Sequence, residues 1–332
     1  MLYRGRHVTL VSFGAFAAVD GMLVVTLCCY ALYLKGFAIS GALLGMLPIS
    51  LLMVWGGARL FHLAALGRKL LDKPSKYLAE TGFYVHGGIL GGVGWILLTS
   101  SVAGVPPLVL ADGLFWGGAL GQFFGRLGCL NYGCCFGRPT ESPCGIAYTN
   151  KDSKILRWRP ELAGVRVHPT QLYLAGSNLL FFLLACALLQ RPIPDGALTC
   201  LCLAWHAATR LVVECFRQDI YFHGRRNPIT FVASLGTLTA AAALACVGMF
   251  LIPNALSCSA LVRPMTMRTV AELWHGAPAL WAAVGTVGLL AFLGYGVHGR
   301  KLGMVPWVTP AESRVPAPAV VQAVELETPP QP

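Results

Sequence analysis

Long apolar blocks separated by short polar segments dominate the chain, and they predict its secondary structure. As a helix, about 20 apolar residues cross the hydrocarbon core of a bilayer. Only helices and closed barrels satisfy every backbone polar group in lipid, and blocks of this length are too long for barrel strands. The pattern predicts an all-α, polytopic transmembrane helical protein with seven to eight spans. The blocks cover residues 8–34, 40–62, 82–103, 105–124, 168–190, 196–216, 229–252 and 277–297.

The two ends of the chain add detail to this plan. Arg4 and Arg6 precede an apolar run longer than a signal-peptide core, and no small-residue cleavage site follows it, so we interpret this run as the first span. The end of the chain is rich in Pro, Ala, Val and Glu, which cannot bury a core. We expect a seven-span membrane domain over residues 1–256, an additional C-terminal span within 257–304 and a Pro-rich disordered tail over 305–332.

Composition and charge narrow the classes of partner. The chain is 56% hydrophobic and only 12% charged, whereas soluble domains carry about 25% charged residues. Its net charge of +11 sits mostly in the segments that flank the blocks. Charges in such positions are attracted to anionic lipid headgroups. We therefore expect membrane lipids as partners and no nucleic acid.

The segment GRLGCLNYGCCFGRPT, residues 125–140, holds the start of a cysteine cluster made of Cys129, Cys134, Cys135 and Cys144. Its spacing differs from the C-x2-4-C pairs of structural zinc sites, and adjacent cysteines rarely both point at one metal. We therefore expect no metal site. A disulfide in an oxidising compartment remains open, as does a catalytic thiolate at Cys129 activated by a neighbouring arginine.

Arg126 suggests a different chemistry for the same segment. It lies between Gly125 and Gly128, with Gly133 and Gly137 further on. Because glycine permits positive φ and the close approach of a ligand, we expect a turn there that presents Arg126 at the membrane surface. A guanidinium suits bidentate binding of a lipid phosphate. The alternative is an interfacial arginine that reaches to water.

A second polar cluster closes the sixth block, in HAATRLVVECFRQD. It comprises His206, Arg210, Glu214 and Arg217, spaced by four, four and three residues. On a helix this spacing places all of them on one face. Ionisable groups gathered near a membrane are costly and mark a site by default. The alternative is that Arg210 and Glu214 only pair with each other.

A histidine opens the glycine-rich third block, in YVHGGILGG. The neighbouring Gly87 and Gly88 belong to a glycine series that permits close helix packing. Packing does not account for His86, which at neutral pH can act as a general base or a hydrogen-bond donor.

Two further features complete the set of polar candidates. Asp112 is an acid within the fourth block that has no evident partner in the sequence. HPTQLY opens the fifth block and offers Gln171 and Tyr173 as polar groups at the membrane interface.

In order and spacing, these motifs resemble those of the prolipoprotein diacylglyceryl transferases of bacterial membranes, over most of residues 8–252. The family's H-G-G motif is similar to His86-Gly87-Gly88, and the acidic position of its fourth span corresponds to Asp112. Its signature G-R-x-G-N-x-x-N-G-E-x-x-G is similar to Gly125-Arg126-Leu127-Gly128, which continues to Gly133 and to Gly137-Arg138. Its H-P-S-Q-L-Y-E segment is similar to His168-Pro169-Thr170-Gln171-Leu172-Tyr173, and its R-x-x-x-E-x-x-R motif corresponds to Arg210, Glu214 and Arg217.

The resemblance implies transfer of the diacylglyceryl group of phosphatidylglycerol to the thiol of a prolipoprotein lipobox cysteine, with release of glycerol phosphate. It implies no metal and no organic cofactor, and a place in the bacterial cytoplasmic (inner) membrane. The catalytic residues it implies are His86, Arg126, Arg210 and Glu214. The residues expected to bind lipid or headgroup are Gly87, Gly88, Gly128, Gly133, Gly137, Arg138, Gln171, Tyr173, His206 and Arg217.

The sequence also departs from the family motifs. Cys129 stands where the signature has Asn, Cys134 where it has Glu, Leu174 replaces the Glu after Q-L-Y, His206 replaces a Tyr, and Phe13-Gly14 replaces Tyr-Gly. These changes keep the phosphate-binding arginines and alter the polar lining. They leave open a related transferase with another acceptor, or a non-enzymatic lipid-binding membrane protein.

Membrane orientation follows from the order of the spans. The N-terminus and the segments 63–80, 125–167 and 217–228 are expected on one side, which holds most of the Lys and Arg. The positive-inside rule assigns that side to the cytoplasm, whereas the resemblance assigns it to the outside. Since capture of an anionic lipid needs positive charge on the working face, we favour the outside.

Overall fold

A computed structural model describes residues 3–4, 8–67, 71–72, 85–217, 221–222, 225–226, 232, 235–239 and 260–299. Its long helices are α1 (Phe13–Leu34), α2 (Gly41–Leu66), α5 (Val85–Ala103), α6 (Pro107–Tyr132), α8 (Thr170–Leu189), α9 (Ala197–Glu214) and α12 (Pro278–Gly296). Its shorter helices are α7 (Lys154–Trp158), the 3-10 helix η1 (Pro160–Leu162) and α11 (Met267–Gly276). Its strands are β1 (Tyr3–Arg4), β2 (Val8–Leu10), β3 (Ile146–Ala147), β4 (Arg166–Val167), β5 (Tyr221–Phe222), β6 (Arg225–Arg226) and β7 (Val297–Gly299).

The long helices confirm the predicted all-α membrane architecture. Within the described residues, five helices are long and apolar enough to cross a membrane, namely α1, α2, α8, α9 and α12, and α5 contributes a shorter apolar helix. Each predicted block except 229–252 coincides with one long helix. Most of that seventh block lies outside the described residues.

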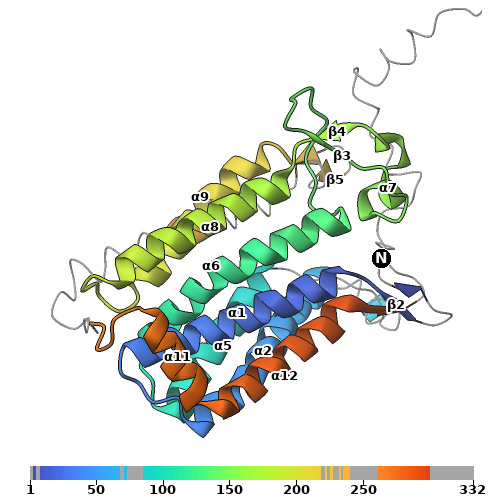
Figure 1. Ribbon diagram of the computed structural model, residues 1–332. Coiled ribbons are helices and arrows are strands. Elements are labelled where there is room, and N and C mark those ends of the chain that lie inside the picture. The colour runs from blue at the N-terminus through green and yellow to red at the C-terminus, as the bar shows by residue number, and fades with distance from the viewer. Residues whose placement is uncertain are drawn as a thin grey trace, which may run out of the picture.

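Helix α6 is the centre of the bundle, with α1, α8 and α9 packed against it (Figure 1). Small residues on α6 let α1 approach closely. A Cβ placed on Gly117 would lie 2.6 Å from the carbonyl oxygen of Val24, and one placed on Gly128 would lie 2.7 Å from Cβ of Phe16. Glycines at such positions allow backbones to pack tightly where lipid offers no hydrophobic drive for association.

Close packing through glycine also joins α2 and α5. A Cβ on Gly87 would clash with the carbonyl oxygen of Gly57, and one on Gly88 would lie 3.5 Å from the Val54 side chain. Helix packing therefore requires glycine at position 87, whereas at position 88 a Cβ would make only an ordinary van der Waals contact.

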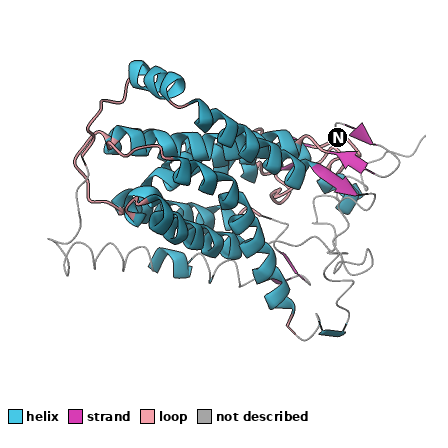
Figure 2. Cartoon of the chain, turned by 90° about the horizontal axis from the view of Figure 1, so that it is seen from below, coloured by secondary structure: helices cyan, strands magenta, loops and turns pink. Residues whose placement is uncertain are grey.

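Helix α12, in the segment where an additional C-terminal span is expected, packs against α1 and α2. Gly296 meets Gly14 so closely that a Cβ on Gly296 would lie 2.9 Å from the Gly14 Cα. Beyond the helix, β7 pairs antiparallel with β2, which pairs with β1. Figure 2 shows this sheet beside the N-terminus at one end of the helices. The first block consequently begins as a strand and becomes helical only at Phe13, later than predicted.

At the opposite end of the bundle, buried polar groups fix the helix ends. Asp112 accepts hydrogen bonds from the backbone N–H groups of Gly196 and Thr199, each at 2.8 Å, and from the Thr199 hydroxyl at 2.7 Å. The acid that lacked a partner in the sequence thus caps the N-terminus of α9. Nearby, Lys35 and Asp195 form a buried ion pair of 2.8 Å.

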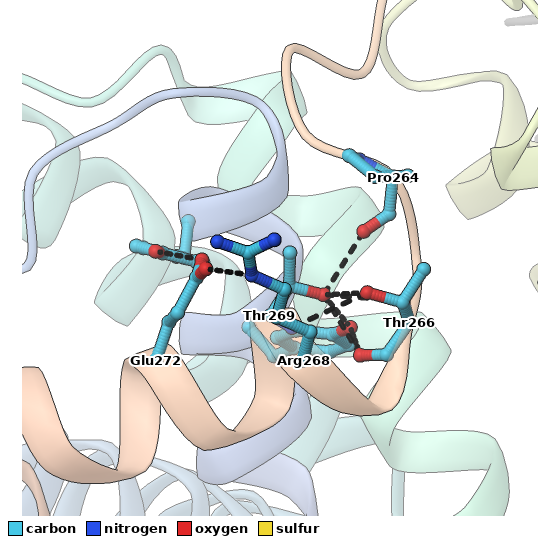
Figure 3. Close-up of polar contacts among 7 residues, drawn as sticks. Pro264, Thr266, Arg268, Thr269 and Glu272 are labelled. Atoms are coloured by element: carbon cyan, nitrogen blue, oxygen red, sulfur yellow. Dashed lines mark hydrogen bonds and ion pairs between the residues drawn. The ribbon is translucent and has the colours of Figure 1, made fainter.

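Helix α11 was not anticipated from the sequence. A capping box begins it, because the Thr266 side chain accepts from the Thr269 N–H while the Thr269 hydroxyl accepts from the Thr266 N–H (Figure 3). Arg268 and Glu272 form an exposed ion pair of 3.1 Å one turn further on. Its neighbour α1 supplies the Tyr30 hydroxyl, 2.9 Å from that of Thr269.

Candidate functional site

The C-terminal end of α6 carries the signature segment, and its geometry corrects one prediction. The helix continues to Tyr132, so Gly125, Arg126 and Gly128 are helical and form no turn. The turn comes at Gly133, which caps the helix with φ of 75°. Its N–H bonds the Cys129 carbonyl at 2.9 Å, as in a left-handed helix cap. The turn was predicted too early because glycine in a membrane helix also serves packing.

Arg126, Arg210 and Arg217 come together where α6 and α9 end. Arg210 interacts electrostatically with both other arginines and with Glu214. It also forms an ion pair with Glu214, with Nη2 and Oε2 3.1 Å apart. The pairing offered as the alternative is therefore present, and it holds Arg210 within a larger cationic cluster.

Within this cluster, Arg126 has a hydrogen-bond donor without an acceptor among the described residues. Its Nε is buried and has no hydrogen-bond partner among the described residues. A buried unsatisfied N–H is costly. Guanidinium groups bind phosphate in bidentate geometry, so an anionic oxygen is a chemically suitable partner for this end of the bundle.

The loop after α6 is held between the start of α8 and the end of α9. The Gly137 N–H donates to the His168 carbonyl at 3.0 Å, and the Arg138 N–H donates to the Phe216 carbonyl at 2.8 Å. A Cβ on Gly137 would lie 2.8 Å from the Phe216 carbonyl oxygen, so only glycine fits. The guanidinium of Arg138 lies 5.8 Å from the centre of the Phe216 ring.

Three side-chain hydrogen bonds hold this loop in place, two to its own carbonyl groups and one from its Tyr148 to the end of α6. The Thr170 hydroxyl donates to the Cys135 carbonyl at 2.5 Å, and the Gln171 amide donates to the Cys134 carbonyl at 2.6 Å. The Tyr148 hydroxyl donates to the Leu130 carbonyl at 3.2 Å. Gln171 is therefore buried in the protein, whereas the sequence suggested an interfacial position for it.

Tyr173 lies at the edge of this arrangement. It is partly exposed, and its hydroxyl is 3.1 Å from Nδ1 of His168. Burial, together with the charge of Arg138, lowers the pKa of His168. The interfacial position predicted for Tyr173 agrees with its exposure.

The thiols of Cys129, Cys134 and Cys135 form a compact group beside the arginines. Their sulfur atoms all lie within 4.8 Å of one another. Hydrogen bonds from Cys129 and Cys134, helped by the charges of Arg217 and Arg126, hold the pKa of the Cys135 thiol well below its usual range. Cys144, the fourth member of the predicted cluster, is exposed and does not belong to this group.

Asp20 lies beside Arg126 and is a candidate site residue that the sequence motifs did not indicate. It accepts a hydrogen bond from the Gln122 amide at 3.1 Å and interacts electrostatically with Arg126. A Cβ on Gly125 would lie 2.9 Å from its Oδ2. A signal was available, because Asp20 is the only charged residue in the first apolar block and intramembrane charges mark functional sites.

Two predicted residues are located less fully. His86 belongs to the first turn of α5, and its side chain lies outside the described residues. His206 lies on α9, one turn before Arg210, and is partly buried. The roles of both stay predictions.

Comparison with known proteins gives one consistent family. A family model described as prolipoprotein diacylglyceryl transferase matches residues 6–256. A Clostridium tetani protein named phosphatidylglycerol--prolipoprotein diacylglyceryl transferase is 32% identical over 168 residues, 49% of this chain and 63% of that protein. Proteins of the same name are similar in Wolbachia sp. subsp. Brugia malayi (31% over 144 residues, 42% and 51%) and Synechococcus elongatus (31% over 170 residues, 49% and 57%). The chain thus spans between 51% and 63% of the length of these curated relatives.

Proposed function

Because the chain belongs to the prolipoprotein diacylglyceryl transferase family, we propose that it transfers the diacylglyceryl group of phosphatidylglycerol to the thiol of a lipobox cysteine in a prolipoprotein. The second product is glycerol phosphate. We further propose that this multi-pass protein works in the bacterial cytoplasmic (inner) membrane. The names of its relatives contain both the lipid and the prolipoprotein, and these substrates are carried over to this chain as part of the proposal.

The observation that supports this function best is the cationic cluster with its unused donor. Arg126 and Arg210 interact electrostatically across the ends of α6 and α9, and the buried Nε of Arg126 has no hydrogen-bond partner among the described residues. A phosphodiester headgroup would supply that partner. The position also fits the substrate, since a lipid phosphate lies at the end of membrane helices.

The proposed reaction is a displacement at carbon. The thiolate sulfur attacks the glycerol carbon that bears the phosphate, a C–S bond forms, and the C–O bond breaks with its electron pair remaining on the phosphate. The departing phosphate monoester gains negative charge, which Arg126 and Arg210 neutralise. Glu214 orients Arg210 through their ion pair, and His86 takes the thiol proton or positions the headgroup.

The remaining predicted residues would shape the headgroup site. Arg138 and Arg217 extend the positive surface, and Gln171 holds the loop through the Cys134 carbonyl. We propose that Tyr173 and His206 contact the headgroup, and that Gly133 and Gly137 position the loop beside it.

A transfer assay with purified protein tests the proposal. Labelled phosphatidylglycerol and a lipobox peptide are supplied, and lipidated peptide and glycerol phosphate are both measured. We expect Arg126→Ala to lower the rate by about 10²- to 10³-fold, the usual loss when a donor to developing negative charge is removed. Arg191→Ala, which changes an exposed arginine just beyond α8, should leave the rate unchanged and serves as the matched control.

Each other result has a defined meaning. Release of glycerol phosphate without peptide lipidation would assign the chain to a transferase with another acceptor. The absence of both products, under conditions in which a relative is active, would refute the transferase proposal.

A further inference from the structure

Three cysteine thiols converge beside the proposed phosphate site. Cys129 lies in the last turn of α6, and Cys134 and Cys135 directly follow its glycine cap. Their sulfur atoms lie within 4.8 Å of one another. Three thiolates around one tetrahedral ion with Zn–S bonds of about 2.3 Å lie about 3.8 Å apart. Small side-chain rotations would bring the group to that spacing.

The backbone explains how two adjacent cysteines share one side of the loop. Consecutive side chains of an extended segment point to opposite faces. Cys135 has φ of 58°, and among the described residues it is the only one other than glycine with positive φ. This conformation is strained for a residue with a Cβ, and it breaks the alternation of side chains between the two faces. The sequence argument against a metal, that neighbouring cysteines diverge, does not hold for this loop.

The group is also held in place and balanced in charge. Thr170 and Gln171 bind the carbonyls of Cys135 and Cys134, which fixes the loop from α8. Arg126 and Arg217 interact electrostatically with Cys135. Three thiolates with one divalent cation carry a single net negative charge, which these guanidinium groups offset.

We propose that Cys129, Cys134 and Cys135 bind one thiophilic divalent cation of the Zn²⁺ class and leave its fourth coordination position open. Ligand sets made only of thiolate select soft cations. Three protein ligands with an open position are the pattern of catalytic zinc sites, whereas structural sites are closed by a fourth protein ligand. Cys144 is exposed and outside the group, so it does not close this one.

The open position has an evident occupant, an inference that rests on the proposed function. The proposed reaction alkylates a thiol, and a metal-bound thiol is deprotonated at neutral pH. The acceptor cysteine would bind as the fourth ligand, lose its proton to solvent or a base, and keep its sulfur beside the arginine cluster.

Metal binding is tested without reference to activity. The full-length, detergent-solubilised protein is reduced, titrated with Zn²⁺, desalted and analysed for zinc by mass spectrometry. We expect one Zn²⁺ per wild-type chain and a loss of affinity of at least about 100-fold in Cys129→Ser and Cys134→Ser, since even outer-shell changes cost 10- to 100-fold. Cys135→Gly removes a thiol while suiting the positive φ, so it should lose zinc without losing the fold.

Cys144→Ser is the matched control and should retain one zinc per chain. Wild-type protein that binds no zinc in the reduced state would overturn the proposal, as would equal zinc binding by Cys135→Gly and wild type.

The fourth ligand is tested with the Co²⁺-loaded protein and two peptides. A lipobox peptide should intensify the sulfur-to-cobalt absorption, and the same peptide with Ser in place of Cys should not. If the spectrum is unchanged in protein that lipidates the peptide in the transfer assay, the acceptor thiol is not the fourth ligand of the metal. Zinc binding without any transfer would instead count against the proposed function alone.

Discussion

Gly133 and Gly164 distinguish two reasons for a glycine, a positive φ and a lack of space for a Cβ. Both have positive φ, 75° and 76°, but a Cβ on Gly133 would lie 3.1 Å from Cβ of Ser153, whereas Gly164 has open space around it. Alanine should cost about 1–2 kcal/mol at either position through backbone strain. Gly133→Ala should cost more because of the additional contact. Thermal unfolding in detergent checks this, and equal shifts for the two variants would contradict it.

His168 gives the loop a pH response whose sign is defined. Burial and Arg138 lower its pKa below the ordinary 6.5. At a pH between the lowered pKa of the folded state and the ordinary pKa of the unfolded state, the unfolded chain binds more protons than the folded one. Stability therefore rises with pH through that window and falls as the pH drops below about 6.5. We expect the dependence of Tm on pH to flatten in His168→Gln. An unchanged profile in this variant would mean that another group is responsible.

Single residues also mark the limit of what the sequence predicted about the site. The spacing of Arg210 and Glu214 correctly indicated that they are neighbours, because helical periodicity brings residues four apart to one face. The prediction that Arg217 shares this helix face was wrong, because α9 ends at Glu214 and Arg217 approaches Arg210 from the segment that follows the helix. The partners of Asp112 and Asp20 lie on other helices. Their identity depends on tertiary packing, which no local pattern encodes.

At the scale of elements, the contact between α1 and α6 depends on which side of α6 each glycine faces. A Cβ on Gly117 would lie 2.6 Å from the Val24 carbonyl oxygen, whereas the adjacent Gly118 has nothing within 4 Å. Gly117→Val should therefore destabilise the protein by about 1–3 kcal/mol, the usual cost of overpacking. Gly118→Val should have little effect. Size-exclusion chromatography after heating compares the two variants, and equal loss of folded protein would argue against this interface.

The elements were easier to predict than their ends. Block length alone located the helices because lipid demands complete backbone hydrogen bonding. The ends depend on local pairing, which explains why the first helix begins only at Phe13 and why α6 extends to Tyr132. The amphipathic α11 was missed since it is too short for a span.

At the scale of the whole molecule, α12 lies outside the 6–256 region that the family model matches, yet it packs on α1. Gly296 contacts Gly14, whereas Gly294 has open space around it. We expect Gly296→Val to lower Tm and Gly294→Val to leave it unchanged, in differential scanning fluorimetry of the solubilised protein. Identical Tm values would show that α12 contributes little to the stability of the family domain.

The hydrogen bonds of Asp112 also have a consequence for the direction in which side chains point around the axis of α9. Arg210 follows Thr199 by 11 residues, so the two side chains are offset by only about 20° around α9. On α6, Asp112 and Arg126 are 14 residues apart and are offset by about 40°. The hydrogen bonds between Asp112 and Thr199 fix the rotation of α9 relative to α6 at one end. Arg126 and Arg210, at the other end, therefore lie close to the same side of their helices as this contact. Removing one residue of α9 between these points would turn its arginine by about 100°, so the cap at one end of the bundle sets the direction in which charge points at the other.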